Sequence, residues 1–268
     1  MAAASARMSS PLARPALRAW RAWVLPLGLL LVAEGLLRWR PMQSDAIALP
    51  SAVALALARA LSNGSLWVAT GQTLAAMLGG LLVGGALGLV VGTWFGLYRS
   101  VAARGALLVE LLRPLPAVAL IPVAMLVFGF GYRLEIFVVG FSVFFPMLVL
   151  SRSAVLAVPA RLIEVGRMLR LTLAARVGKI VLPAALPRLF VALRLCIGIA
   201  LVVAVTTEIA SNPQGLGYAL LSAQQSLAPD LMLAVLVWVG LLGWGVNAGL
   251  LALQQRWFGG MAEAGAGA

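Results

Sequence analysis

The chain contains no histidine and a single cysteine, Cys196, among its 268 residues. A disulfide within the chain is therefore impossible, and histidine-containing metal sites and Ser-His or Cys-His nucleophiles are excluded. Acidic residues are also scarce: eight Asp and Glu stand against 20 Lys and Arg, which gives a formal net charge of +12. We therefore expect no catalytic residue, no metal ion and no cofactor on this chain.

A nucleotide site of the P-loop type is missing as well. Such a loop needs the pattern G-x-x-x-x-G-K-[S/T] to surround phosphates with backbone N–H groups. The only lysine, Lys179, follows Gly178 but has neither the upstream glycine nor a following hydroxyl residue. If ATP drives this protein, the hydrolysis must take place on another polypeptide.

Charged residues make up only 10% of the chain and hydrophobic ones 63%, with a mean hydropathy of +1.04. Soluble domains are about 25% charged and about 45–50% apolar. The composition therefore predicts an all-α polytopic membrane protein. The basic residues gather between apolar runs, as the positive-inside rule expects, so the net charge does not indicate binding to nucleic acid.

About 20 apolar residues are needed for each membrane-spanning helix. The sequence predicts six transmembrane helices within one transmembrane domain at residues 23–258, between an N-terminal tail at 1–22 and a C-terminal tail at 259–268, both cytoplasmic. For the first span a cleaved signal peptide is the alternative; Glu34 interrupts the apolar run late, which favours a retained helix. The predicted spans are 24–37, 66–98, 106–130, 134–150, 189–209 and 231–253.

Three further features qualify these spans. Residues 40–64 predict a short amphipathic helix at the membrane surface. The third span contains Pro114, Pro116 and Pro122, so we expect a kinked helix buried in the bundle, after a turn at Arg99 and Arg104. Residues 211–218, Ser-Asn-Pro-Gln-Gly-Leu-Gly-Tyr, predict an outside loop without basic residues.

Glycines recur every fourth residue along the second span. Such spacing places small residues on one helix face, where two backbones approach closely in lipid. We expect this stripe to be a helix-packing surface, and it consists of Gly80, Gly84, Gly88, Gly92 and Gly96.

The most charged segment is residues 158–184, which must lie in water on the cytoplasmic side. Pro159 is suited to a helix start, and Glu164 is spaced to pair with Arg161 and Arg167. A second short helix is predicted from the N-cap Thr172 to Leu182, where Pro183 should end it. A pair of amphipathic helices of this kind favours docking to a partner.

The spacing in this segment resembles the EAA loop of ABC importer permeases. Their pattern is E-A-A, three residues, G, nine residues and I-x-L-P; this chain has Glu164-Val165-Gly166, then Arg170, then Ile180-Val181-Leu182-Pro183. It departs from the pattern at Arg170, so any tight turn there must form without glycine. The resemblance implies coupling to an ATPase through Glu164, Gly166, Arg170, Leu171 and Thr172.

A second stretch, LLRPLPAVALIPVAMLVFGFG at residues 111–131, resembles the sulfonate, taurine and nitrate branch of these permeases, and residues 215–218 continue the resemblance. The resemblance implies a permease subunit of the bacterial cytoplasmic (inner) membrane, in contact with lipid. It further implies two copies in a homodimer, two ATP-binding cassette ATPase subunits and an extracytoplasmic substrate-binding protein. The implied solute is an alkanesulfonate, taurine or a nitrate-like anion, although the branch also carries pyrimidine-like organic solutes.

Glu208 lies near the outer end of the fifth predicted span, and an ionisable residue at membrane depth is a functional candidate. Two interpretations stay open: a gate residue facing a central pathway, or an interfacial carboxylate capped by Thr206, Thr207 or water. Arg133 and Glu135 are expected to be interface residues beside a turn. An ion-gradient-driven secondary transporter is the competing function; it predicts inverted repeats and paired midplane acids, which the sequence does not display clearly.

Overall fold

The computed structural model describes residues 16–39 and 48–266, and side chains from 24 to 39 and from 48 to 256. All regular elements of these residues are helical, which confirms the predicted fold class. They are α1 (Ala16–Trp39), α2 (Pro50–Ser62), α3 (Ser65–Leu97), α4 (Arg99–Leu112), the 3-10 turn η1 (Ala117–Leu120), α5 (Ile121–Phe128), α6 (Tyr132–Leu156), α7 (Ala160–Met168), α8 (Leu173–Arg176), the π-helical η2 (Val177–Val181), α9 (Leu182–Ser211), α10 (Gly215–Gln225) and α11 (Pro229–Ala266).

Among the described residues, four helical stretches are long and apolar enough to cross a membrane: Ser65–Leu97, Tyr132–Leu156, Leu173–Ser211 and Pro229–Arg256. The pair formed by α4 and η1–α5 adds a fifth if it counts as one span. The predicted first span lies within α1, which begins inside the predicted N-terminal tail. The helix α11 likewise continues into the predicted C-terminal tail.

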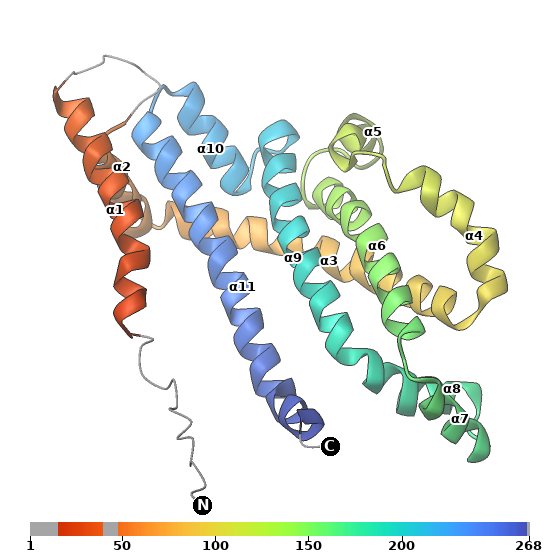
Figure 1. The fold of residues 1–268 in the computed structure, drawn as a ribbon. Coiled ribbons are helices and arrows are strands. Elements are labelled where there is room, and N and C mark those ends of the chain that lie inside the picture. Colours follow the sequence, from red (N-terminus) through yellow and green to blue (C-terminus); the bar gives the residue numbers. More distant parts are fainter. Residues whose placement is uncertain (1–15, 40–47, 267–268) are drawn as a thin grey trace, which may run out of the picture.

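The bundle is built around α3, α6 and α9. In Figure 1, α6, α9 and α11 lie side by side, and α3 crosses behind them. The main buried cluster draws Met77 from α3, Val143 from α6, and Cys196, Ala200 and Ala204 from α9. Many outward-facing aliphatic side chains remain exposed, as expected for surfaces that contact lipid.

The closest helix contact joins α3 to α6 along the glycine stripe. A Cβ atom added to any of the five glycines Gly80, Gly84, Gly88, Gly92 or Gly96 would come within 3.0 Å of an α6 atom. At Gly84 the obstructing atoms are the backbone of Gly140, which is itself a glycine. The two backbones therefore meet directly, and only glycine leaves room for that approach.

The predicted third span is a broken helix rather than a kinked one. Its halves, Arg99–Leu112 and Ala117–Phe128, are bent by 80°. Pro114 and Pro116 cannot donate helical hydrogen bonds, and each disfavours the helical conformation of the residue before it. The turn predicted at Arg99 and Arg104 lies at Tyr98, directly before Arg99, and Arg104 belongs to α4, much of whose surface is exposed.

The helix end that the sequence predicts at Pro183 is absent. Pro183 does not end the short helix after Thr172, because the chain continues through η2 into α9. A π-helical turn bonds residues five apart and is wider than an α-turn. The extra width removes the usual conflict between a proline ring and the carbonyl four residues before it.

Candidate functional site

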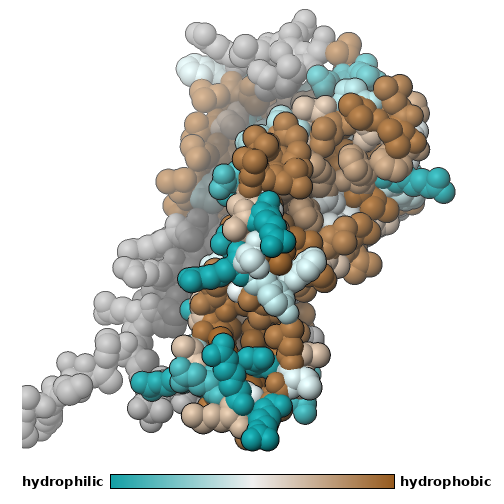
Figure 2. All heavy atoms as spheres, turned by 90° about the vertical axis from the view of Figure 1, so that its right-hand side faces the viewer, coloured by the Kyte–Doolittle hydropathy of each residue, from teal (hydrophilic) through white to brown (hydrophobic). Residues whose placement is uncertain are grey.

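The charged segment forms a separate projection at the lower end of the molecule, where α7 and α8 lie beyond the end of α6 (Figure 1). Figure 2 shows the right-hand side of Figure 1; it is mostly hydrophobic, with one group of hydrophilic residues at the lower end and others at mid-height. Five apolar side chains of the projection are 41–82% exposed: Leu162, Val165, Met168, Leu169 and Leu173. An apolar patch rimmed by charge is typical of a protein-docking surface.

Gly166 holds α7 against the base of α9. It is buried, and a Cβ atom there would lie 2.8 Å from Cδ1 of Ile180 and 3.2 Å from Cγ of Arg176. Beside it, Ile163 packs against a buried cluster that includes Val181 and Ala185. This packing joins α7 to the helix that continues as α9.

Arg170 makes the turn between α7 and α8 in the left-handed conformation, with φ of 50°. The Leu171 N–H donates to the Gly166 carbonyl at 3.0 Å, and this bond closes the turn. Thr172 then caps α8 by accepting the Ala175 N–H at 3.3 Å, which confirms the predicted N-cap. The left-handed conformation explains why glycine suits the Arg170 position.

We expect Arg170→Gly to raise the melting temperature of the detergent-purified protein. The left-handed conformation costs a non-glycine residue about 1–2 kcal/mol, and the greater freedom of glycine in the unfolded chain offsets only part of that gain. The matched control is Arg167→Gly in α7, which should lower stability by about 1 kcal/mol because its conformation is helical. Equal shifts in both variants would contradict the strain at Arg170.

Glu164 is exposed on α7 and forms no ion pair within 4.0 Å with any described residue, so the pairing predicted with Arg161 and Arg167 is absent. Water competes well with such exposed pairs, which contribute little to stability. The carboxylate of Glu164 is therefore free to meet a group outside this chain.

Glu208 lies at the other end of the bundle, where it is 1% exposed and helps to begin α10. Three consecutive N–H groups of α10 are bonded by side chains of other helices. The Gly215 N–H donates to Oε1 of Gln72 at 2.9 Å, the Leu216 N–H to Oγ1 of Thr73 at 2.9 Å, and the Gly217 N–H to Oε2 of Glu208 at 2.8 Å. The predicted outside loop therefore shortens to residues 212–214, and a helix starts at Gly215.

The surroundings of Glu208 bear on the interpretation in which the neighbouring threonines cap it. The hydroxyls of Thr206 and Thr207 donate to the carbonyls of Val202 and Val203 instead of capping the carboxylate. Glu135 was predicted to be an interface residue beside a turn, and this prediction is wrong. The residue is fully buried and accepts a hydrogen bond from Nδ2 of Asn212. Its partner is 77 residues away in sequence, so local context gave no sign of the burial.

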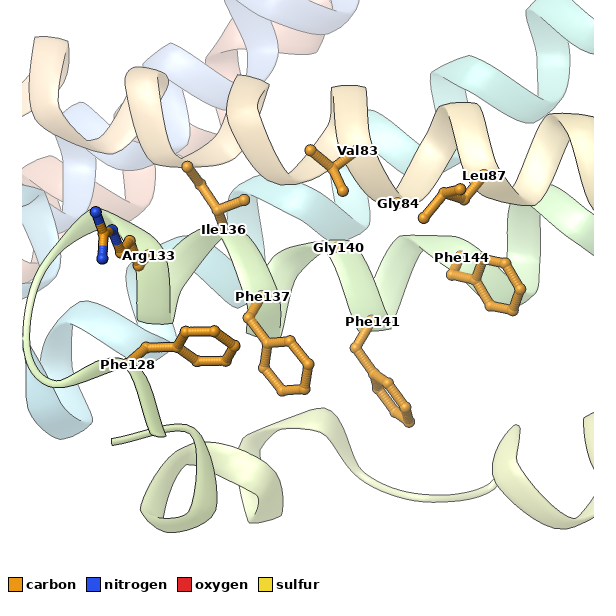
Figure 3. A pocket seen from close by; sticks show the side chains of 10 residues that line it. All are labelled: Val83, Gly84, Leu87, Phe128, Arg133, Ile136, Phe137, Gly140, Phe141 and Phe144. Atoms are coloured by element: carbon orange, nitrogen blue, oxygen red, sulfur yellow. The ribbon is translucent and has the colours of Figure 1, made fainter. Parts of the chain in front are cut away.

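A groove of about 430 Å³ lies between α3, α5 and α6 (Figure 3). Phe128 of α5 and Phe137 of α6 line it with ring centroids 5.2 Å apart, and Phe141 projects to the same side. Arg133 stands at one end of this phenylalanine groove. Glu208 does not line the groove.

Comparison with protein families shows that residues 84–258 match the family described as binding-protein-dependent transport system inner membrane component. A putative ABC transporter permease protein of Methanocaldococcus jannaschii is 34% identical over 74% of this chain and 74% of its own length. The taurine transport system permease protein TauC of Escherichia coli is 29% identical over 72% and 70%. The bicarbonate transport system permease protein CmpB of Synechococcus elongatus is 31% identical over 74% and 70%.

The fold is also similar to a solved one. A chain of the inward-facing MetNI methionine ABC transporter superposes with a TM-score of 0.57 at 21% sequence identity. The superposition covers 78% of this chain and 99% of that one. The likeness concerns the arrangement of helices.

Proposed function

Because this chain belongs to the family of binding-protein-dependent transport system inner membrane components, we propose that it carries a small oxyanion through the inner membrane as the permease subunit of an ABC importer. We assign the contact with the ATPase subunit to the α7–α8 projection. It joins an unpaired carboxylate, Glu164, to exposed apolar side chains on a segment packed onto a spanning helix.

The projection contacts the ATPase subunit, and α7 is the element that inserts into that subunit. Leu162, Val165 and Met168 supply apolar contact area, and Glu164 supplies the single negative charge. Four further residues give the projection its shape. Gly166 lets α7 pack on η2. The turn and the cap that follow are formed by Arg170, Leu171 and Thr172. ATP hydrolysis belongs to that separate subunit, and no cofactor is assigned to this chain.

Transport follows from linkage between the two ends of the molecule. ATP-driven closure of paired ATPase subunits displaces α7, and the packing of Ile163 and Gly166 passes the displacement to α9. Packed helices shift between discrete arrangements, so the spans alternate between inward-open and outward-open states. The different contacts of nucleotide with the two states supply the free energy.

The assembly that we propose contains two copies of this chain, two ATPase subunits and a substrate-binding protein on the outer side. Seven arginines and Lys179 between positions 152 and 194 support a cytoplasmic position for the α7–α8 end under the positive-inside rule. The Ala16 end of α1 and the far end of α11 lie at the same end of the molecule in Figure 1, which supports cytoplasmic termini.

The solute class is proposed from the relatives that carry taurine and bicarbonate, together with the branch-type stretch at residues 111–131. Sulfonates and bicarbonate share small size and a negatively charged group of oxygens. A pyrimidine-like organic solute moved by the same mechanism is the alternative. The family match across most of the chain favours an importer over a secondary transporter driven by an ion gradient.

Reconstitution tests the proposed function. We expect the tagged chain, purified in mild detergent from its native host, to bring a P-loop ATPase with it. In liposomes that complex, supplied with its binding protein, should accumulate labelled taurine or bicarbonate only when ATP is present. Uptake that follows a sodium or proton gradient without the ATPase would overturn the importer assignment, and ATP-dependent uptake of uracil alone would overturn the solute class.

A further inference from the structure

Two fully buried glutamates lie on the packed helices α6 and α9: Glu135 of α6, which is 0% exposed, and Glu208 of α9, which is 1% exposed. Each has one oxygen bonded and one oxygen free. Asn212 bonds Oε1 of Glu135 and the Gly217 N–H bonds Oε2 of Glu208. Oε2 of Glu135 and Oε1 of Glu208 are both buried without a hydrogen-bond partner. Asn212 touches both residues: its Nδ2 donates to Oε1 of Glu135, and its N–H donates to the backbone carbonyl of Glu208 at 3.3 Å.

Positive charge is missing from the described surroundings of this pair. The helices α3 and α5 and the turn η1 contain no charged residue, and the titratable residue of α10 is Tyr218. In α9 the nearest cation is Arg194, 14 residues before Glu208, or about 21 Å along the helix. In α11, Asp230 and Arg256 form no ion pair with either glutamate.

Arg133 is only two positions before Glu135, but it does not neutralise it. Residues two apart in a helix do not share a face. The Arg133 side chain is exposed and stands at the end of the phenylalanine groove (Figure 3), whereas Glu135 is fully buried. No ion pair within 4.0 Å joins them.

Two unpaired carboxylates buried together cost several kcal/mol each, and a group in that position becomes neutral instead. The geometry points to a proton-binding site: we propose that Glu135 and Glu208 hold one proton between them, carried by Glu135. The added proton changes Oε2 of Glu135 from an unfilled acceptor into a donor, for which Oε1 of Glu208 is the free acceptor. One proton thereby satisfies both unpartnered oxygens.

The proton belongs to Glu135 because the two carboxyl groups have different partners. Glu208 accepts a backbone N–H in the first turn of α10, where the helix dipole favours negative charge. The donors beside Glu135 are side-chain amides: Asn212, which bonds its Oε1, and Gln214. The anion therefore stays on Glu208, as the cap of α10, and the neutral acid on Glu135 links α6 to that cap. We expect a protonated Glu135 to hold α6, α9 and α10 together at this end of the bundle.

Infrared spectroscopy detects this proton directly. In dodecyl maltoside, which contains no carbonyl group, the protein at pH 7 should show the C=O stretching band of a protonated carboxylic acid, shifted in D2O. Exposed carboxyl groups are ionised at this pH, so they add nothing to the band. Glu135→Gln should remove the band, whereas Glu208→Gln and the exposed control Glu164→Gln should keep it.

A wild-type spectrum without the band overturns the proposal, whatever the variants do. A band that survives in Glu135→Gln overturns the assignment of the proton. A band that disappears when sodium chloride replaces choline chloride places a metal cation between the carboxylates and overturns it as well. The measurement needs neither ATPase nor solute, so its failure is distinct from failure of the transport function.

Discussion

Gly84→Ala is expected to disrupt the folded bundle. The added methyl group should lower the stability of the protein more than any other substitution that we propose. A Cβ atom at position 84 would collide with the carbonyl and Cα of Gly140, which belong to the backbone of α6. Because no side chain can rotate away, α3 and α6 must separate along their glycine contact. Overpacking of this kind costs about 1–3 kcal/mol, and lost contacts at the neighbouring glycines add to it.

The chain provides a matched control in the adjacent residue. Gly85 is also buried in α3, yet a Cβ atom there would lie 3.7 Å from the Leu81 side chain and 3.8 Å from Val143, in ordinary contact. We expect Gly85→Ala to elute as a monodisperse peak and melt near the wild-type temperature, while Gly84→Ala melts markedly lower and aggregates. Indistinguishable melting of the two variants would show that the α3–α6 contact does not depend on backbone approach.

The glycine stripe was predictable because its period of four residues is a local property of the sequence. The turn at Arg170 was predictable for the same reason: spacing within one segment located it, although a left-handed arginine could only be seen in the structure. The break after Leu112 was harder, since Pro114 and Pro116 fit a kinked helix and a broken one equally well. The choice depends on how neighbouring helices satisfy the freed backbone groups.

The site at the other end of the bundle depends on distant residues, which limits what the sequence can predict. The helix α10 begins at Gly215 because Gln72 and Thr73, 143 residues earlier in each case, accept its first N–H groups. Local composition at residues 211–218 indicates only a turn. Glu135 likewise follows Arg133 at a helix start, and its burial arises from contact with Asn212. The local signs of this site were the acidic Glu208 within an apolar span and the Asn-Pro-Gln-Gly sequence that follows it.

Glu164→Arg is expected to abolish transport while leaving the protein folded in the membrane. Glu164 is exposed and forms no ion pair within 4.0 Å with the described residues, so the fold gains little from its charge. The same charge is the only negative one among the basic residues of the α7–α8 projection. Its reversal changes the docking surface by two charge units, and a like-charge contact with a cation of the ATPase costs several kcal/mol.

Three measurements on one preparation separate docking from later steps. Elution and melting of Glu164→Arg should match the wild type, ATPase co-purification should fall at least tenfold, and ATP-dependent uptake in liposomes should disappear. Glu164→Asp, which keeps the charge on a shorter side chain, should retain most of both activities. Normal uptake by Glu164→Arg would remove this residue from the ATPase contact. Wild-type co-purification with lost uptake would instead show that the ATPase docks without Glu164, and that the carboxylate acts when α7 passes its displacement to α9.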